Sequence, residues 1–288
     1  MSTYCIVTPV RNEEEHLSEL VESLVAQTVR PSHWVLVDDG SSDSSAAMID
    51  QYASQHDWLT LLQRPDRGQR APGGGVVETF MTGYELVKDD EWDFVVKLDA
   101  DMSLDPDFFE RCLERFAADP QLGIGGGTVS DRLNDGTLRH DPHPAFHVRG
   151  ATKIYRRECW EAIGGMVQAK GWDTIDEVKA NQLGWRTTTF HDIPILQQRV
   201  TGHRAGSWSD ISKNGRAAWF CGYHPLFALA RAVRLSTIPP YLLLGLAFAS
   251  GYGKAMLTRA DRIDDPELIS YVQREQLNRL RGRPSIWR

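Results

Sequence analysis

Short apolar runs alternate with helical patterns over the first hundred residues, and this alternation limits the fold more than any other feature of the sequence. The apolar runs, rich in β-branched residues, occupy residues 4–8, 34–37, 59–63 and 94–98. Helical spacing of apolar residues occupies residues 17–27, 44–55 and 76–87. This order is typical of βαβ units, in which helices connect parallel strands and cover the sheet. The sequence therefore predicts an α/β, Rossmann-like fold with a mostly parallel central sheet flanked by helices.

The alternation weakens after Asp105, and two further helices are expected beyond it. The carboxylate of Asp105 can cap a helix that continues to about residue 118 and has Pro106 in its first turn. A second helix is expected from Asp173 to Leu183, because Gly184 suits the left-handed C-cap of a helix.

The segment between these two helices is rich in glycine and histidine. Glycines crowd residues 123–127, an Asn-Asp-Gly turn stands at residues 134–136, and histidines gather at residues 140–147. Glycine has no side chain to pack in a sheet and often marks a turn or a bulge. This segment therefore predicts irregular β structure built around the edge of the sheet.

The chain has 288 residues, of which 41% are hydrophobic and 25% are charged, as in an ordinary globular protein. Its formal net charge of −7 argues against a protein whose whole surface binds nucleic acid, so no nucleic-acid partner is expected. The four cysteines are far apart and form no CxxC pair, which argues against a zinc knuckle or a disulfide framework. The N-terminal residues lack the features of a signal peptide, and we expect a cytoplasmic protein.

Residues 235–253 carry no charge, but Pro239-Pro240 and three glycines interrupt them, so we do not expect a membrane span. Arg231, Arg234 and an arginine-rich tail favour a helical hairpin that lies in the membrane surface. Peripheral membrane contact is then expected through residues 216–288. A helical layer packed on the main domain is the alternative.

Acidic and polar side chains follow three of the predicted strands. The segments are Pro9-Val10-Arg11-Asn12-Glu13, Asp38-Asp39-Gly40 and Asp99-Ala100-Asp101. In an open parallel sheet, ligands bind beyond the carboxyl ends of the strands, so we expect these side chains to meet in one place. Carboxylates that gather there repel one another, and a cationic or hydrogen-bond-donating group is expected to join them.

Asp99-Ala100-Asp101 is the most informative of these segments. Two carboxylates separated by one small residue at a strand end can bind a hard divalent cation, Mg²⁺ or Mn²⁺, together with substrate phosphates. The chain lacks the GxxxxGK[ST] loop and a GxGxxG motif after its first strand, the two commonest phosphate-binding loops. A nucleotide could instead be held by Asp39 at a base N–H, by Pro9 and Arg11 around the base, and through a metal ion on Asp101. The alternative for the Asp39 segment is a helix-capping turn.

Four segments, in this order and at this spacing, resemble the family 2 glycosyltransferases with the GT-A fold: TPVRNEE, the Gln27-Thr28 pair, VLVDDGSSD and KLDADM. The resemblance covers roughly residues 3–200. It implies an inverting enzyme that moves a sugar from a nucleotide-diphosphate donor to an acceptor hydroxyl while a divalent cation stabilises the departing diphosphate.

The same resemblance implies a division of the chain. Residues 1–205 would form the GT-A catalytic domain. Its nucleotide-binding half would be residues 1–101 and its acceptor-binding half residues 102–205. Residues 206–288 would form the C-terminal helical extension, either associated with a membrane or packed on the catalytic domain.

The resemblance also assigns roles to individual residues. The expected donor-binding residues are Pro9, Arg11, Asn12, Glu13, Asp39, Arg67, Arg70, Asp99, Ala100 and Asp101. Among them, Asp39 would bind the base, Asp101 would be the main metal ligand, and Asp99 would face the ribose or the metal shell. Arg67 or Arg70, from a basic glycine-rich loop, would neutralise the leaving diphosphate.

Members of the family typically have an acidic pair ahead of a helix that ends in Gly-aromatic-Arg, and the ending here is Gly184-Trp185-Arg186. Counting back to the usual position reaches Asp173, which is expected to be the catalytic base, with Asp176 and Glu177 as rivals. Trp172 stands where glutamate is common. It would stack on the acceptor sugar or, alternatively, anchor the core.

A second departure concerns the metal shell. Some members carry a histidine that can bind the metal where this chain has Gln197-Gln198-Arg199. The shell would then rely on Asp101 and phosphate oxygens, or use His191 or His203.

The leading hypothesis is a metal-dependent inverting glycosyltransferase in cell-surface polysaccharide or glycolipid assembly. It would act at the inner face of the cell membrane on a saccharide or lipid-linked acceptor. The alternative enzyme is a nucleotidyltransferase, although the glycine-rich basic loop that it needs directly after the first strand is absent. A non-catalytic nucleotide-sugar-binding scaffold is the alternative from another class, and carboxylates at every expected acidic position argue against it.

Overall fold

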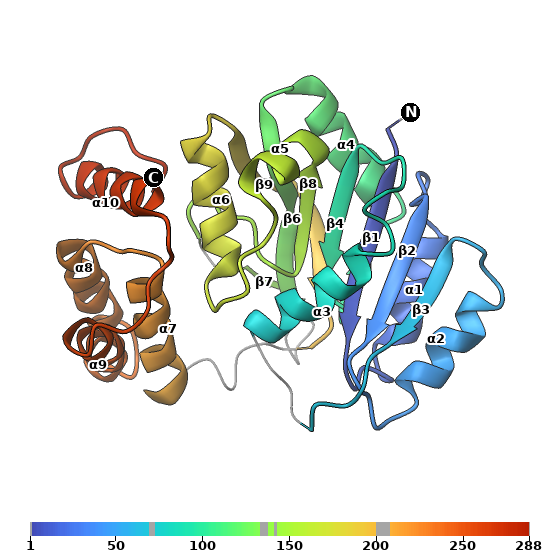
Figure 1. Ribbon diagram of the computed structural model, residues 1–288, viewed down its shortest axis with the longest axis horizontal. Helices are drawn as coiled ribbons and strands as arrows, with labels where there is room; N and C mark the ends of the chain where they lie inside the picture. The colour runs from blue at the N-terminus through green and yellow to red at the C-terminus, as the bar shows by residue number, and fades with distance from the viewer. Residues whose placement is uncertain (1, 69–72, 133–137, 141–142, 200–207, 288) are drawn as a thin grey trace. The chain divides into compact units, whose positions relative to one another are not determined.

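The computed structural model describes residues 2–68, 73–132, 138–140, 143–199 and 208–287 of the chain (Figure 1). The chain consists of two compact units, Met1–Val200 and Thr201–Arg288. In the described residues, the first unit holds a sheet with helices on both faces, and the second unit is helical. The predicted α/β fold with C-terminal helices is therefore confirmed.

One sheet runs through the first unit. Its strands are β1 (Tyr4–Val10), β2 (His33–Asp38), β3 (Leu59–Gln63), β4 (Phe94–Leu98), β5 (Met102–Leu104), β6 (Leu122–Arg132), β7 (Leu138–His140), β8 (Thr152–Arg156) and β9 (Arg186–Gln197). They lie in the order β3-β2-β1-β4-β8-β6-β9-β5, and β7 pairs with β6. The strands β3, β2, β1 and β4 are parallel, whereas β8 runs antiparallel to both β4 and β6. The parallel arrangement thus holds for the strands of the first hundred residues, and the other half is mixed.

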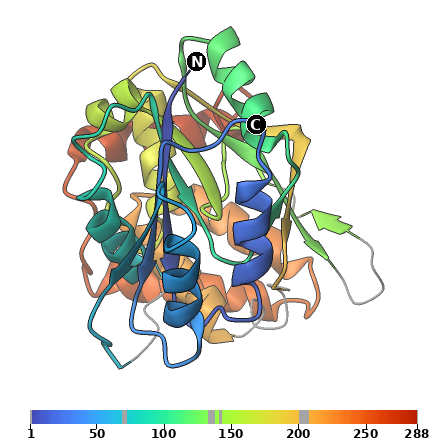
Figure 2. The ribbon, with the colours of Figure 1, turned by 90° about the vertical axis from the view of Figure 1, so that its right-hand side faces the viewer.

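Helices cover both faces of this sheet. One apolar core contains residues of α1 (Leu17–Val25), α2 (Ser45–Ala53) and α4 (Phe108–Ala118), and the other contains residues of α3 (Gly74–Tyr84), α5 (Arg157–Ile163) and α6 (Trp172–Gln182). Because strand side chains alternate in direction, Tyr4 and Ile6 of β1 enter the first core while Cys5 and Val7 enter the second. Figure 2 shows α1 (blue) and α3 (teal) on opposite sides of the sheet.

The prediction for the glycine-rich segment is right about irregular β structure and wrong about the sheet edge. The pairing of this segment with β9 shifts register between Leu122 and Ile124 and between Gly127 and Thr128. Its residues belong to β6, which lies inside the sheet between β8 and β9. The glycines make room for neighbouring groups, since a Cβ at Gly126 would overlap the carbonyl oxygen of Thr152 and one at Gly127 would lie 2.7 Å from that of Ile193. The Asn-Asp-Gly turn at residues 134–136 lies outside the described residues.

The prediction that Asp105 caps the next helix is also wrong. Helix α4 begins at Phe108, and its N-cap is Asp107. The carbonyl oxygen of Asp105 accepts hydrogen bonds from the backbone N–H of Phe108 at 3.0 Å and from the side chain of Gln27 at 2.8 Å. Pro106 therefore precedes the helix. Asp105 contributes its backbone carbonyl oxygen, not its side chain, and this oxygen links the turn to Gln27 just after α1.

The second unit consists, in its described residues, of α7 (Trp208–Phe220), α8 (Pro225–Ser236), α9 (Leu243–Leu257) and α10 (Pro266–Leu280). Helix α9 packs closely on α7 and α8 through glycines. A Cβ at Gly251 would overlap the carbonyl oxygen of Ser212, and a Cβ at Gly245 would overlap that of Ala232. None of the helices within the described ranges is both long and apolar enough to cross a membrane.

Candidate functional site

The carboxyl ends of β1, β2 and β4 lie at the same edge of the sheet. Strand β1 is between the other two strands and parallel to both, with Val10 opposite Asp38 and Val7 opposite Lys97. The loops that carry Arg11, Asp39 and Asp99 therefore leave neighbouring strands in the same direction. The structure brings these three segments together, as expected from the alternating pattern of the sequence.

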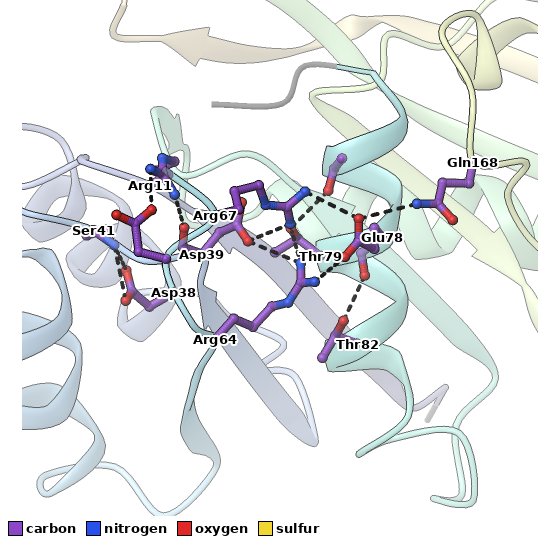
Figure 3. Close-up of polar contacts among 12 residues, drawn as sticks. Arg11, Asp38, Asp39, Ser41, Arg64, Arg67, Glu78, Thr79, Thr82 and Gln168 are labelled. Atoms are coloured by element: carbon purple, nitrogen blue, oxygen red, sulfur yellow. Dashed lines mark hydrogen bonds and ion pairs between the residues drawn. The ribbon is translucent and has the colours of Figure 1, made fainter. Parts of the chain in front are cut away.

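Two arginines from the segment after β3 neutralise the buried carboxylate of Asp39 (Figure 3). Arg64 and Arg67 donate to Asp39 Oδ1 at 3.1 and 2.7 Å, and Asp39 is only 8% exposed. Both guanidinium groups also pair with Glu78 of α3, whose pKa is lowered mainly by Arg64. Gln168 donates to the same Glu78 carboxylate at 3.3 Å and so connects this cluster with the loop before α6. For Asp39, the expected cationic partners are therefore Arg64 and Arg67 of the same chain.

The loop after β1 is fastened to the turn after β2. Arg11 donates to the carbonyl oxygen of Asp39. Asn12 has a φ of +54°, and its side-chain oxygen accepts from the backbone N–H of Ser42 at 2.8 Å. Pro9 is the half-buried residue in the otherwise buried β1. The loop and the turn therefore form one polar surface at the end of the two strands.

Asp101 is a buried carboxylate with polar neighbours. It is 7% exposed and accepts from Gln197 Nε2 at 3.1 Å. Burial raises the pKa of Asp101, and the nearby charge of Asp99 raises it further. Arg199 lies close enough to oppose this rise, and it pairs with the buried Glu13 at 2.6 Å. Arg199 thus forms an ion pair with Glu13, and its charge also lowers the pKa of Asp101.

Asp99 forms an ion pair with Lys97, a charged residue within the buried β4. The ammonium group of Lys97 also donates to the carbonyl oxygen of Gly150 at 2.5 Å. Ala100 is buried and separates Asp99 from Asp101. Within the part of the chain that the structure describes, no three His, Cys, Asp or Glu side chains gather in a group that could hold a metal ion. The assignment of Asp99 and Asp101 as metal ligands stays a prediction.

The donor set fits a hard divalent cation. Mg²⁺ and Mn²⁺ prefer oxygen ligands, and Mg²⁺ usually takes one or two carboxylates together with substrate phosphates and water. Burial, and then the charge of Asp99, raise the pKa of Asp101, and a bound cation would oppose both effects. Gln197, the first residue of the Gln197-Gln198-Arg199 segment, donates a hydrogen bond to Asp101. His191 packs against His143 with ring centroids 6.4 Å apart, and His203 lies outside the described residues.

The expected base and its tryptophan neighbour lie at the start of α6. Asp173 is half-buried in the first turn of the helix. Trp172 is 6% exposed and belongs to the core between the sheet and the helices. A Cβ added at Gly150 would lie 2.8 Å from the Trp172 ring and 3.5 Å from the Cβ of Asp173. Lys97, the ion-pair partner of Asp99, donates to the carbonyl oxygen of Gly150, so Asp99 and the start of α6 lie near the same glycine. Stacking of Trp172 on an acceptor sugar stays a prediction, and little of the ring is available for it.

A buried ionic cluster supports the start of α6. The ammonium group of Lys153 donates to the backbone oxygen of Asp173 at 2.6 Å and pairs with Asp176 at 2.9 Å and Glu177 at 2.7 Å. His147 Nδ1 lies 2.9 Å from Glu177, and the Glu177 charge raises the pKa of His147 against the effect of burial. Burial raises the pKa of Asp176 to about 6 despite Lys153. Asp176 and Glu177, the alternative bases, are thus buried and paired with Lys153.

Lys97 and Lys153 are direct neighbours across β4 and β8. Like charges opposite each other destabilise a sheet unless each has a partner. Lys97 is compensated by Asp99, and Lys153 by the acidic pair of α6. The Trp172 ring lies near both ammonium groups, at 5.7 and 5.3 Å from its centroid. The two neighbouring lysines therefore contact Asp99, an expected metal ligand, and the backbone of Asp173, the expected base.

Sequence reasoning did not assign Arg64, Glu78, Lys97, Lys153 or Arg199 to the site. The available signal was a lysine inside an apolar strand, at position 97 and again at position 153, because a buried lysine requires an acidic partner. The expected diphosphate ligand Arg67 lies instead on Asp39 in this structure.

Arg70 lies outside the described residues, so its predicted contact with the diphosphate has no structural counterpart here. The same holds for its neighbours Gln69, Ala71 and Pro72.

Comparison with known proteins identifies similar sequences and folds. The family model described as glycosyl transferase family 2 matches residues 5–172. An undecaprenyl-phosphate 4-deoxy-4-formamido-L-arabinose transferase from Pseudomonas fluorescens is 34% identical over 204 residues, which cover 69% of this chain and 54% of that protein. The chain therefore spans about half the length of the curated relatives that it matches.

Two solved structures show a similar fold at low sequence identity. A mannosyltransferase from Pyrobaculum calidifontis, in complex with GDP-Man and Mn²⁺, has a TM-score of 0.55 and 18% identity, over 99% of this chain and 76% of that one. GalNAc-T7 with UDP, GalNAc and Mn²⁺ has a TM-score of 0.62 and 14% identity, over 90% of this chain and 56% of that one. These likenesses support the GT-A architecture.

Proposed function

Because this chain belongs to glycosyl transferase family 2, we propose that it moves a sugar from a nucleotide-diphosphate donor to an acceptor with inversion at the sugar carbon. The observation that carries this proposal is the meeting of three parallel strand ends at one edge of the sheet. Asp39, Asp99 and Asp101 follow these strands, and Asp173 lies near Gly150, whose carbonyl oxygen accepts from Lys97, the partner of Asp99. A nucleotide, a metal-bound diphosphate and a base then have adjacent positions.

In this proposal the donor nucleotide lies over the loops after β1 and β2. Asp39 accepts from an N–H of the base, and Pro9, Arg11, Asn12 and Glu13 line the nucleoside pocket. The two arginines on Asp39 support this role, because they compensate a buried carboxylate that an uncharged base could not neutralise.

The diphosphate would be bound near Asp99, Ala100 and Asp101. A Mg²⁺ or Mn²⁺ ion held by Asp101 and Asp99 supplies positive charge that stabilises the leaving diphosphate. Arg67 or Arg70 adds a second positive charge, for which Arg67 has to leave its contact with Asp39.

Asp173 would remove the proton from an attacking acceptor hydroxyl. Its position in the first turn of α6 supports this role, because the buried Lys153 holds the backbone of that residue in place. Trp172 would contribute to the acceptor site from the same turn.

The acceptor is proposed to be a lipid-linked phosphate or saccharide of cell-surface polysaccharide or glycolipid assembly. The relative from Pseudomonas fluorescens supports this choice, since its name describes transfer involving undecaprenyl phosphate. The enzyme would then work on the cytoplasmic face of the cell membrane, where nucleotide sugars and such lipids meet.

The test is a panel of nucleotide sugars incubated with the protein, Mn²⁺ and either undecaprenyl phosphate or a lipid-linked saccharide. Transfer of labelled sugar from one donor, with release of the nucleoside diphosphate, is the expected result. Release of pyrophosphate from a nucleoside triphosphate and a sugar phosphate would favour the nucleotidyltransferase. Binding of nucleotide sugars without turnover in any combination would favour the scaffold.

A further inference from the structure

The turn between α8 and α9 exposes a run of apolar side chains. Residues 238–243, with the sequence Ile-Pro-Pro-Tyr-Leu-Leu, are all exposed, and Tyr241, Leu242 and Leu243 are 67%, 64% and 52% exposed. We name these six residues the apolar tip. Single exposed apolar residues are common on protein surfaces, but a contiguous set indicates an interaction surface.

The apolar surface continues from the tip along both helices. On α8, Leu226, Leu229 and Val233 are exposed at the spacing of one helical face. On α9, Leu246 is exposed one turn after Leu242. The exposed apolar side chains thus extend the tip onto the adjoining helix faces.

The hairpin of α8 and α9 does not use these side chains for its own packing. The two helices meet through small residues, because Gly245 lies against the backbone of the buried Ala232. Phe248 and Tyr252 are buried on the inner side of α9, and the Tyr252 hydroxyl donates to the carbonyl oxygen of Tyr223 at 2.7 Å. The tip is therefore available to a partner without unfolding the hairpin.

The charged residues nearest to the tip along the sequence are all basic. The chain has a net charge of −7, but residues 211–260 contain no Asp or Glu. The basic residues of this segment are Lys213, Arg216, Arg231, Arg234, Lys254 and Arg259. Arg231 and Arg234 are exposed in the last turns of α8, immediately before the tip. Such a basic surface complements anionic lipid headgroups, whereas two copies of it would repel each other.

We propose that the apolar tip inserts into the interfacial layer of an anionic lipid bilayer while Arg231 and Arg234 contact lipid phosphates. Apolar side chains beside arginines are the composition of elements that lie in a membrane surface. This docking goes beyond sugar transfer and does not depend on it, since every residue involved belongs to the second unit.

The experiment is flotation of the full chain with two kinds of vesicle, one of phosphatidylcholine and one containing 30% phosphatidylglycerol, a composition of about the charge of anionic membrane surfaces. We expect the protein to float with the anionic vesicles and to remain mostly in the buffer with the neutral ones. The double variant Leu242→Glu/Leu243→Glu should lower the partition coefficient at least about tenfold, because carboxylates replace the inserted groups. Arg231→Glu/Arg234→Glu should abolish the preference for anionic vesicles.

Leu86→Glu is the matched control, since Leu86 is an exposed leucine of the first unit and should not affect flotation. All the substituted side chains are exposed, so circular dichroism should report the same helix content for each variant. A wild-type chain that stays in the buffer with both vesicles would overturn the proposal, as would a tip variant that floats normally. A dimer in sedimentation that is lost in the tip variant, without flotation of the wild type, would assign the surface to a second copy.

Discussion

Lys153→Met tests whether the buried ionic cluster holds the start of α6. Methionine keeps most of the volume of the lysine but removes the charge that Asp176 and Glu177 share. The three charged groups are fully buried, and Lys153 also binds the Asp173 carbonyl oxygen. Loss of one partner from a buried ion pair costs about 3–5 kcal/mol, since an uncompensated charge remains. For a unit of this size, that corresponds to a fall of the melting temperature on the order of 10 °C.

The loss should depend on pH. The pKa of Asp176 is raised from 3.8 to about 6 in the folded chain, so the folded state holds a proton that the unfolded state releases between these values. Stability therefore falls as the pH rises through this window. The raised pKa of His147 acts in the same direction, because its stabilising proton is lost as the pH rises above 6.5. Without Lys153, Asp176 holds its proton more tightly, and the variant should lose more stability at pH 8 than at pH 5.

The assay is urea unfolding followed by tryptophan fluorescence at both pH values. Lys88→Met is the control, because Lys88 pairs with Glu85 on the surface and such pairs contribute about 0–1 kcal/mol. Addition of Asp176→Asn to Lys153→Met should recover part of the stability by removing a buried charge. A loss no larger than that of the control, or the same loss at both pH values, would refute the reasoning.

Three further predictions concern two residues proposed for the reaction, Asp173 and Asp101, and one residue of the sheet. Asp173→Asn should leave donor binding intact and lower turnover with a hydroxyl acceptor by about 10²-fold, whereas undiminished steady-state transfer would remove this residue from the base role. Asp101→Ala should weaken donor binding in the presence of Mn²⁺ but not in its absence, and equal titration calorimetry results in both conditions would contradict a metal ligand. Gly126→Ala should destabilise the protein by about 1–3 kcal/mol in urea unfolding, because its Cβ overlaps the Thr152 carbonyl oxygen, while Gly253→Ala, with open space around it, should not.

The parallel half of the sheet could be predicted because the information is local. Each of these strands is a short apolar run between polar segments, and β3 and β4 span the predicted residues 59–63 and 94–98. Parallel pairing then places their carboxyl ends at one edge, so the convergence of Asp39, Asp99 and Asp101 also followed from the pattern. Their chemical roles remain predictions.

The remainder depends on contacts between residues far apart in the sequence. Glycines 123–127 indicate irregular β structure, which the register shifts of β6 confirm, but they do not indicate that β6 lies inside the sheet, where backbone from β8 fills the space beside Gly126. The partner of Lys153 is Asp176, and the partner of Glu13 is Arg199, 186 residues away. Periodicity along one segment cannot report such pairs, because they are set by which strands become neighbours.

The opposed lysines of β4 and β8 constrain how this protein can change over evolution. Lys97 contacts the segment proposed to bind the donor, and Lys153 supports the segment proposed to bind the acceptor. The Trp172 ring lies near the ammonium groups of both lysines. Substitutions at these positions should therefore show strong epistasis, because removing one ammonium group changes the electrostatic environment of the other. A lineage that alters its donor preference through Lys97 would have to adjust Lys153 at the same time.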